Sequence, residues 1–115
     1  MVTYAPPLRD FRFLLVDVFG LDDIAALPGS DGLNEETVMA IAEAFGAFSA
    51  ERLLPLNAIA DKGCTFEKGS VRTPEGYLEA WRSFCADGWN GLACSGEWGG
   101  QGLPHFVHHM MREML

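Results

Sequence analysis

The chain opens with an apolar pattern that has the period of an α-helix. After Pro6 and Pro7, apolar side chains recur three and four residues apart in residues 8–19, which predicts a first helix that stops at Gly20. One side of this helix carries Phe11, Leu14, Leu15 and Val18, and its other sides carry Phe13, Val16 and Phe19. We therefore expect it to be covered on more than one face, and we expect a further short helical turn in residues 21–27.

The clearest helical signal follows Asn34. Asn34 is a good N-cap, and Glu35 and Glu36 suit the positive end of a helix dipole. The apolar stripe that follows consists of Val38, Ile41, Ala42, Phe45 and Phe48. This pattern predicts a long helix over residues 35–54, which Pro55 should end or kink, with residues 56–60 resuming as a helical turn.

The helical period disappears between residues 61 and 72. This stretch is typical of a small hairpin or exposed loop that turns at Lys68-Gly69. Thr73 as N-cap and Pro74 at the first helical position then predict a third helix, closed by Gly88. Its apolar positions are Tyr77, Leu78, Trp81, Phe84 and Cys85.

Residues 89–103 are too rich in Gly and Trp for regular structure, yet their aromatic rings should be buried, so we expect an ordered loop. A last helix should begin at Pro104. Its apolar residues are Phe106, Val107, Met110, Met111 and Met114. The pattern is still running at Leu115 without a capping residue, which indicates an interrupted helix. The whole pattern predicts a mainly α, bundle-like unit with one long Gly/Trp-rich loop.

Length and charge narrow the possible functions. A chain of 115 residues fits one domain. Sixteen acidic and eight basic residues give a net charge of -8, and the basic residues are scattered, which argues against nucleic acid and anionic membranes as partners. Cys64, Cys85 and Cys94 are odd in number and lack metal-like spacing, which is typical of reduced thiols. With no signal sequence or membrane span in the pattern, we expect a soluble cytoplasmic protein.

The last predicted helix carries the strongest candidate for a metal site. His105, His108 and His109 are spaced i, i+3 and i+4, and Glu113 follows one turn later. However, no Glu lies between the histidines to act as a base, and His108 and His109 point about 100° apart on a helix. Partly exposed helix histidines are therefore favoured over metal ligands.

Two further candidates lie in the Gly/Trp-rich loop. Residues 96–104 (GEWGGQGLP) place glycines before a helix, as in phosphate loops, but they lack the Lys and Ser/Thr of a P-loop and the spacing of a dinucleotide fingerprint. Ser95 lies a few residues before His105, but no nucleophile elbow surrounds it, which favours a hydroxyl in a hydrogen-bonded turn.

Three stretches together resemble the acyl-CoA dehydrogenase family, in particular its longer bacterial branch similar to methylmercaptopropionyl-CoA dehydrogenases. They are residues 4–15 (YAPPLRDFRFLL), residues 54–57 (LPLN), and residues 88–93 (GWNGLA) followed by 97–104 (EWGGQGLP). The last stretch is the most specific. Cys94-Ser95-Gly96 departs from the family pattern, because relatives usually place a Pro there.

The resemblance implies that residues 1–115 are only the opening section of a family member: residues 1–33 a family-specific N-terminal extension, and residues 34–115 a helical domain truncated at its C-terminus. Relatives oxidise an acyl-CoA thioester with FAD, and the catalytic carboxylate and most FAD contacts lie in later domains. No catalytic, cofactor or metal residue is therefore expected in this chain, nor any cofactor on it alone. The helix after the glycine loop borders the acyl pocket in relatives, which makes Met110, Glu113 and Met114 the candidate substrate-binding residues.

Two hypotheses follow. The first is that the chain is the N-terminal portion of an FAD-dependent acyl-CoA dehydrogenase of fatty acid metabolism and is inactive alone. Its partners would then be the remaining domains, the acyl-CoA substrate and further copies in a homo-oligomer. The alternative is a free-standing, non-catalytic helical module that binds another protein through exposed apolar residues. The residues that motivate the alternative are Phe13, Val16, Phe19, Met111 and Met114.

Overall fold

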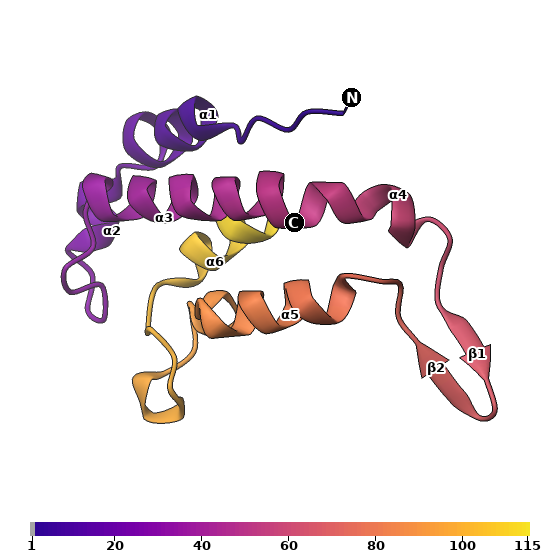
Figure 1. The fold of residues 1–115 in the computed structure, drawn as a ribbon. Coiled ribbons are helices and arrows are strands. Elements are labelled where there is room, and N and C mark those ends of the chain that lie inside the picture. The colour runs from indigo at the N-terminus through magenta and orange to yellow at the C-terminus, as the bar shows by residue number, and fades with distance from the viewer. Residues whose placement is uncertain (1) are drawn as a thin grey trace.

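The computed structural model describes residues 2–115 and is mainly helical (Figure 1). Its α-helices are α1 (Leu8–Arg12), α2 (Leu21–Ala25), α3 (Glu35–Phe48), α4 (Asn57–Ala60), α5 (Tyr77–Ala86) and α6 (His105–Arg112). Strands β1 (Thr65–Glu67) and β2 (Ser70–Arg72) form one antiparallel hairpin. This architecture confirms the mainly α prediction and fits an N-terminal helical domain of an acyl-CoA dehydrogenase.

The first helix runs to Gly20 as predicted, but it changes its winding. α1 continues as a π-helical segment over Phe13–Val18, and the Phe19 N–H bonds to the Leu14 carbonyl at 2.9 Å. Gly20 ends the helix in the left-handed conformation with φ of 70°. A π turn holds more residues than an α turn, so apolar residues spaced three and four positions apart no longer lie on one face of the helix. Phe11 is buried, whereas Leu14 and Val18 are exposed, and α3 covers this helix on one side only.

The long helix begins as the sequence predicts. The Asn34 side chain accepts a hydrogen bond from the Thr37 N–H at 2.8 Å, and the following helix buries Val38, Ala42, Phe45 and Phe48. Its end differs from the prediction, because α winding stops at Phe48. A π-helical segment (Ser49–Leu53) and a 3-10 turn (Leu54–Leu56) lead into α4. Pro55 lacks an N–H and its ring crowds the preceding turn, which explains why the winding changes there.

The hairpin is confirmed, and its turn lies where it was predicted. Lys68 and Gly69 have φ of 49° and 80°, and Phe66 pairs with Val71 across the strands. The expected start of the third helix is wrong: α5 begins at Tyr77, and Thr73 makes no cap. Gly76 has φ of 85° and interrupts the helical path between Pro74 and Tyr77. The predicted end holds, since Gly88 has φ of 81°.

Residues 89–103 form an ordered loop with 3-10 turns at Trp89–Gly91 and Gly96–Trp98. Backbone hydrogen bonds close it, including one from the Leu103 N–H to the Leu92 carbonyl at 2.9 Å. The expected burial of its aromatic rings is confirmed for only part of the loop. Trp89 packs edge-on against Phe45 with ring centroids 5.0 Å apart, but Trp98 is 85% exposed.

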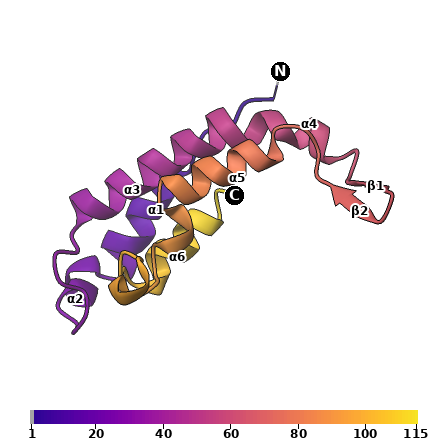
Figure 2. The same cartoon turned by 60° about the horizontal axis from the view of Figure 1, so that its bottom comes forward.

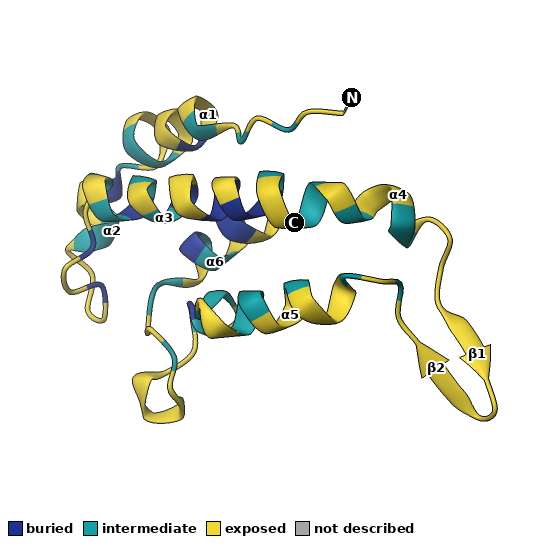
Figure 3. Ribbon diagram, viewed as in Figure 1, coloured by how far each residue is buried: buried dark blue, intermediate teal, exposed yellow. Residues whose placement is uncertain are grey.

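The core lies where α3 crosses α6, with α1, α5 and the Gly/Trp-rich loop around it (Figures 2 and 3). Its fully buried residues include Val38, Phe45, Leu92, Val107 and Met111. The molecule measures 54 × 38 × 17 Å, and its radius of gyration of 16.7 Å exceeds the roughly 13 Å of a compact domain of this length.

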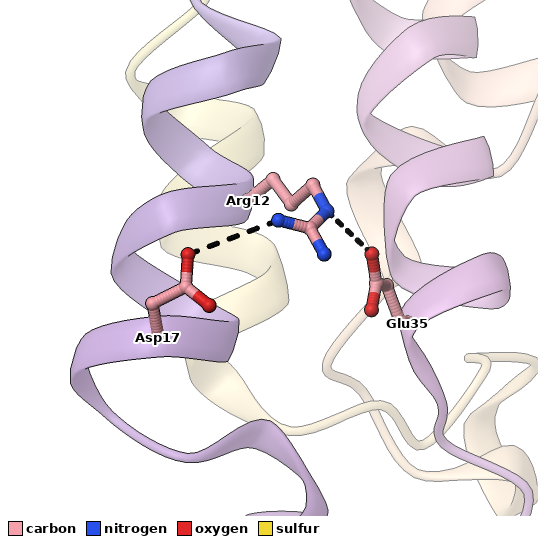
Figure 4. A network of polar contacts seen from close by, with 3 residues as sticks. All are labelled: Arg12, Asp17 and Glu35. Atoms are coloured by element: carbon pink, nitrogen blue, oxygen red, sulfur yellow. Dashed lines mark hydrogen bonds and ion pairs between the residues drawn. The ribbon is translucent and has the colours of Figure 1, made fainter.

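One exposed ion-pair network joins the first helix to α3 (Figure 4). The Arg12 Nε donates to Glu35 Oε1 at 2.6 Å, and Arg12 Nη1 lies 3.8 Å from Asp17 Oδ2. All three side chains are about half exposed, so this network contributes less than about 1 kcal/mol. The burial of Phe11 is the main attachment of the first helix to the core.

Candidate functional site

An apolar hollow lies between the end of the long helix and α5. It has a volume of about 320 Å³. Its lining residues are Leu53, Leu56, Asn57, Tyr77, Ala80, Trp81, Phe84 and Leu115. α5 runs alongside the segment from α3 to α4 in both ribbon views (Figures 1 and 2). We call this hollow the α5 groove.

A smaller hollow of about 120 Å³ adjoins the α5 groove on the other side of Leu53. It is lined by Tyr4, Ser49, Leu53, Leu54, Asn57, Glu113, Met114 and Leu115. Leu53, Asn57 and Leu115 belong to both hollows. The irregular N-terminal segment, the π-helical segment and the last turn of the chain thus meet at one place, which we call the α6 pocket.

The three candidate substrate-binding residues have different surroundings. Glu113 and Met114 line the α6 pocket, and Met114 is only 4% exposed. Met110 lines neither hollow and is part of the buried core. The turn that follows α6 therefore places Glu113 and Met114 at one hollow, while Met110 holds α6 in place by packing in the core.

Two hydroxyl groups of the α6 pocket lack a hydrogen-bond partner within residues 2–115. They are Tyr4 Oη and Ser49 Oγ, both fully buried as atoms. Burial raises the pKa of Tyr4 above its ordinary value, so it remains a neutral donor. Buried hydroxyls are nearly always paired, so this pocket is suited to a polar atom from outside the described residues. No sequence pattern pointed to Ser49, and Tyr4 was marked only as part of the family-like stretch.

The histidines of α6 do not converge on one point. The rings of His108 and His109 are 6.2 Å apart, and no group of three His, Cys, Asp or Glu side chains within residues 2–115 could hold a metal ion. His108 Nδ1 is buried without a partner in the same part of the chain. Burial lowers the pKa of His108, and the charges of Arg112, His109 and His105 lower it further.

The glycine loop uses its backbone N–H groups internally. Gly99, Gly100 and Gly102 donate to the carbonyls of Gly96, Ser95 and Cys94, respectively. These N–H groups are therefore not available to a phosphate. Ser95 Oγ accepts from the Glu97 N–H at 3.3 Å, which confirms that its hydroxyl belongs to a turn.

The three thiols are free, with Cys64 and Cys94 exposed and Cys85 half-buried. Among the described residues, no helix is long and apolar enough to cross a membrane.

Comparison with known proteins supports the resemblance. No protein-family model matches the sequence. The chain is similar to an acyl-CoA dehydrogenase, with 36% identity over 115 residues that cover 99% of this chain. That relative is the 3-methylmercaptopropionyl-CoA dehydrogenase of Ruegeria pomeroyi. The alignment covers 20% of the relative, so this chain spans about a fifth of its length.

Proposed function

We propose that this chain is the N-terminal portion of an FAD-dependent acyl-CoA dehydrogenase, which introduces an α,β double bond into an acyl-CoA thioester. The similarity to an acyl-CoA dehydrogenase over almost the whole chain carries this proposal, and the helical architecture agrees with it. The proposal includes a cytoplasmic location and a homo-oligomeric complete enzyme. The three unpaired cysteines support the location.

The described residues do not fit FAD. The glycine loop has used its N–H groups in internal hydrogen bonds, so they cannot bind the phosphates of a dinucleotide. The α5 groove is almost entirely apolar. We therefore assign this chain a supporting role, which is to enclose the acyl chain and exclude water from the reaction.

The α6 pocket is the proposed contact with the acyl group. Glu113 and Met114 border it directly, and Met110 fixes the position of α6 by packing in the core. The flexible thioether of Met114 suits an apolar chain, while the unpaired hydroxyls of Tyr4 and Ser49 suit a polar atom next to it.

The decisive experiment is to sequence the gene downstream of the codon for Leu115 and to purify the product of the complete reading frame. We expect a yellow flavoprotein that reduces an electron-accepting dye when acyl-CoA is added. In that protein, Glu113→Gln should change the preference for acyl-chain length, whereas the exposed Glu79→Gln on α5 should not. A stop codon after Leu115 with no dehydrogenase sequence downstream would refute the proposal.

The alternative, a free-standing binding module, is favoured by the exposure of Phe13 and Phe19 at the first helix, 55% and 63%. Met111 and Met114, which also motivated it, are buried in the core. Size-exclusion chromatography with light scattering at micromolar concentration tests this alternative. A monomer that binds no hydrophobic dye would remove the need for a partner.

A further inference from the structure

The β1–β2 hairpin extends away from the rest of the molecule. Every residue from 61 to 73 is exposed, and the hairpin lies at one end of the molecule in both ribbon views (Figures 1, 2 and 3). Two strands of three residues each are only marginally stable as an isolated sheet in water. Neither face of this hairpin is covered by the described chain, so both faces are open to another molecule.

The hairpin combines exposed apolar side chains with basic ones. Phe66 and Val71 pair directly across the two strands, so they lie on the same face, and they are 72% and 67% exposed. Residues 62–72, which we call the basic hairpin, carry three of the eight basic residues of the chain and one acidic residue: Lys62, Lys68, Arg72 and Glu67. The three cations form no ion pair with any residue that the structure describes.

The opposite end of the molecule carries the complementary charges. Residues 19–36, which we call the acidic end, include α2 and the start of α3 and contain five carboxylates and no Lys or Arg: Asp22, Asp23, Asp31, Glu35 and Glu36. Glu35 pairs with Arg12, whereas the other four are exposed and form no ion pair within residues 2–115. Phe19 and Leu27 belong to the same segment and are 63% and 57% exposed.

The basic hairpin and the acidic end match in charge, and each also exposes two large apolar side chains. They cannot meet within one molecule, because they lie at opposite ends of its longest dimension of 54 Å (Figure 1). An anionic membrane fits the basic hairpin less well. The rest of the chain carries fifteen acidic residues against five basic ones and would be repelled by the same membrane surface. A second copy of the chain, by contrast, presents a patch of the opposite charge.

We propose that the basic hairpin of one copy binds the acidic end of a second copy. Phe66 and Val71 pack on the apolar side chains of the acidic end, and the cations of the hairpin pair with its free carboxylates. Complementary charge sets the orientation of the two copies, and the apolar pair supplies the burial. The inference does not depend on the dehydrogenase reaction, because both surfaces lie within the described residues.

The test is sedimentation velocity of the chain over a range of concentrations up to high micromolar, with two charge-reversed variants. One is Lys62→Glu with Arg72→Glu in the hairpin, and the other is Asp22→Lys with Asp31→Lys at the acidic end. We expect the unmodified chain to associate, and each variant alone to associate at least about tenfold more weakly because like charges then face each other. An equimolar mixture of the two variants should associate again, because each then offers a patch of the charge that the other needs.

A matched control separates a local contact from a change in net charge. Arg52→Glu with Arg82→Glu changes the net charge by the same amount at exposed positions outside both patches, and this variant should associate like the unmodified chain. Phe66→Ser removes the apolar contact without changing the charge and should also weaken association. Raising NaCl from about 0.1 M to about 1 M shortens the Debye length from about 10 Å to about 3 Å and should weaken it too. Circular dichroism establishes that every variant keeps its helices.

Four outcomes would overturn the inference. They are a chain that stays monomeric at every concentration, an equal loss of association in the matched control, a mixture of the two charge-reversed variants that stays monomeric, and binding to phosphatidylglycerol vesicles that is lost in Lys62→Glu with Arg72→Glu. The last would assign the hairpin to a membrane. If the complete protein is an active flavoenzyme and the chain stays monomeric, this inference fails while the proposed reaction stands.

Discussion

Gly100 approaches the backbone of Cys94 so closely that no larger residue fits between them. A Cβ at position 100 would overlap the Cys94 carbonyl group and would lie 2.5 Å from the Cys94 Cβ. Because the contact is with backbone, it cannot be relieved by turning a side chain. This close approach, and not a phosphate, explains the glycine at this point of the loop.

Gly100→Ala should therefore destabilise the chain by about 1–3 kcal/mol, the usual cost of overpacking. Gly96→Ala in the same loop is the control, since a Cβ there meets nothing within 4 Å. Urea unfolding followed by circular dichroism measures both. Equal stability of the two variants would contradict the close contact.

His108 couples stability to pH. Burial and the charges of Arg112, His109 and His105 lower its pKa in the folded chain. Between that lowered pKa and the ordinary value of about 6.5, the unfolded chain binds more protons than the folded chain, so stability falls as pH falls through this window. The melting temperature should drop as the pH falls below about 6.5, and His108→Gln should reduce that drop. An equal drop in the variant would assign the pH dependence to other groups.

At the scale of elements, the start of α3 depends on one polar side chain. Asn34 caps the helix through the Thr37 N–H, while Glu35 forms the exposed ion pair with Arg12. Cap bonds satisfy a helix donor that has no other partner, whereas exposed ion pairs exchange readily with water. The cap should therefore contribute more than the ion pair, although the ion pair is the shorter contact.

Asn34→Ala should lower the free energy of unfolding by about 1 kcal/mol. Asn34→Asp should keep most of the stabilisation that the cap contributes, because a carboxylate also caps. Glu35→Gln should lower it by less than about 1 kcal/mol. Chemical denaturation of the three variants measures these differences. If Glu35→Gln were the more damaging substitution, the ion pair and not the cap would control this end of α3.

At the scale of the whole molecule, the described chain is a thin layer with an uncovered apolar groove and exposed aromatic residues at both ends. None of the described carboxylates is buried in an apolar site. Glu113, the carboxylate at the α6 pocket, is exposed. A solvated carboxylate is a weak base toward a thioester α-proton without an oxyanion clamp.

The 115-residue chain, purified alone, should therefore be colourless and inactive. We expect no flavin absorbance after gel filtration in the presence of FAD, and no dye reduction with acyl-CoA above a control without protein. Glu113→Gln should leave this background unchanged. Retained flavin, or activity above the control, would show that the described residues hold more of the reaction than their geometry indicates.

The sequence by itself determined the elements whose signals are local. The apolar period and the Asn34 cap predicted the start and buried face of α3, and Lys68-Gly69 predicted the hairpin turn, because these features depend on residues a few positions apart. The family-like stretches predicted the similarity to an acyl-CoA dehydrogenase before any comparison.

Only the tertiary structure decided which apolar residues are covered. Met110 and Met114 are both buried in the core, yet only Met114 also lines a pocket. Trp89 packs in the core and Trp98 does not, although both belong to one Gly/Trp-rich loop. Tyr4 and Ser49 line the same pocket although 45 residues of sequence separate them. Burial and contact depend on how elements distant in sequence pack together, and the local apolar period does not predict that packing.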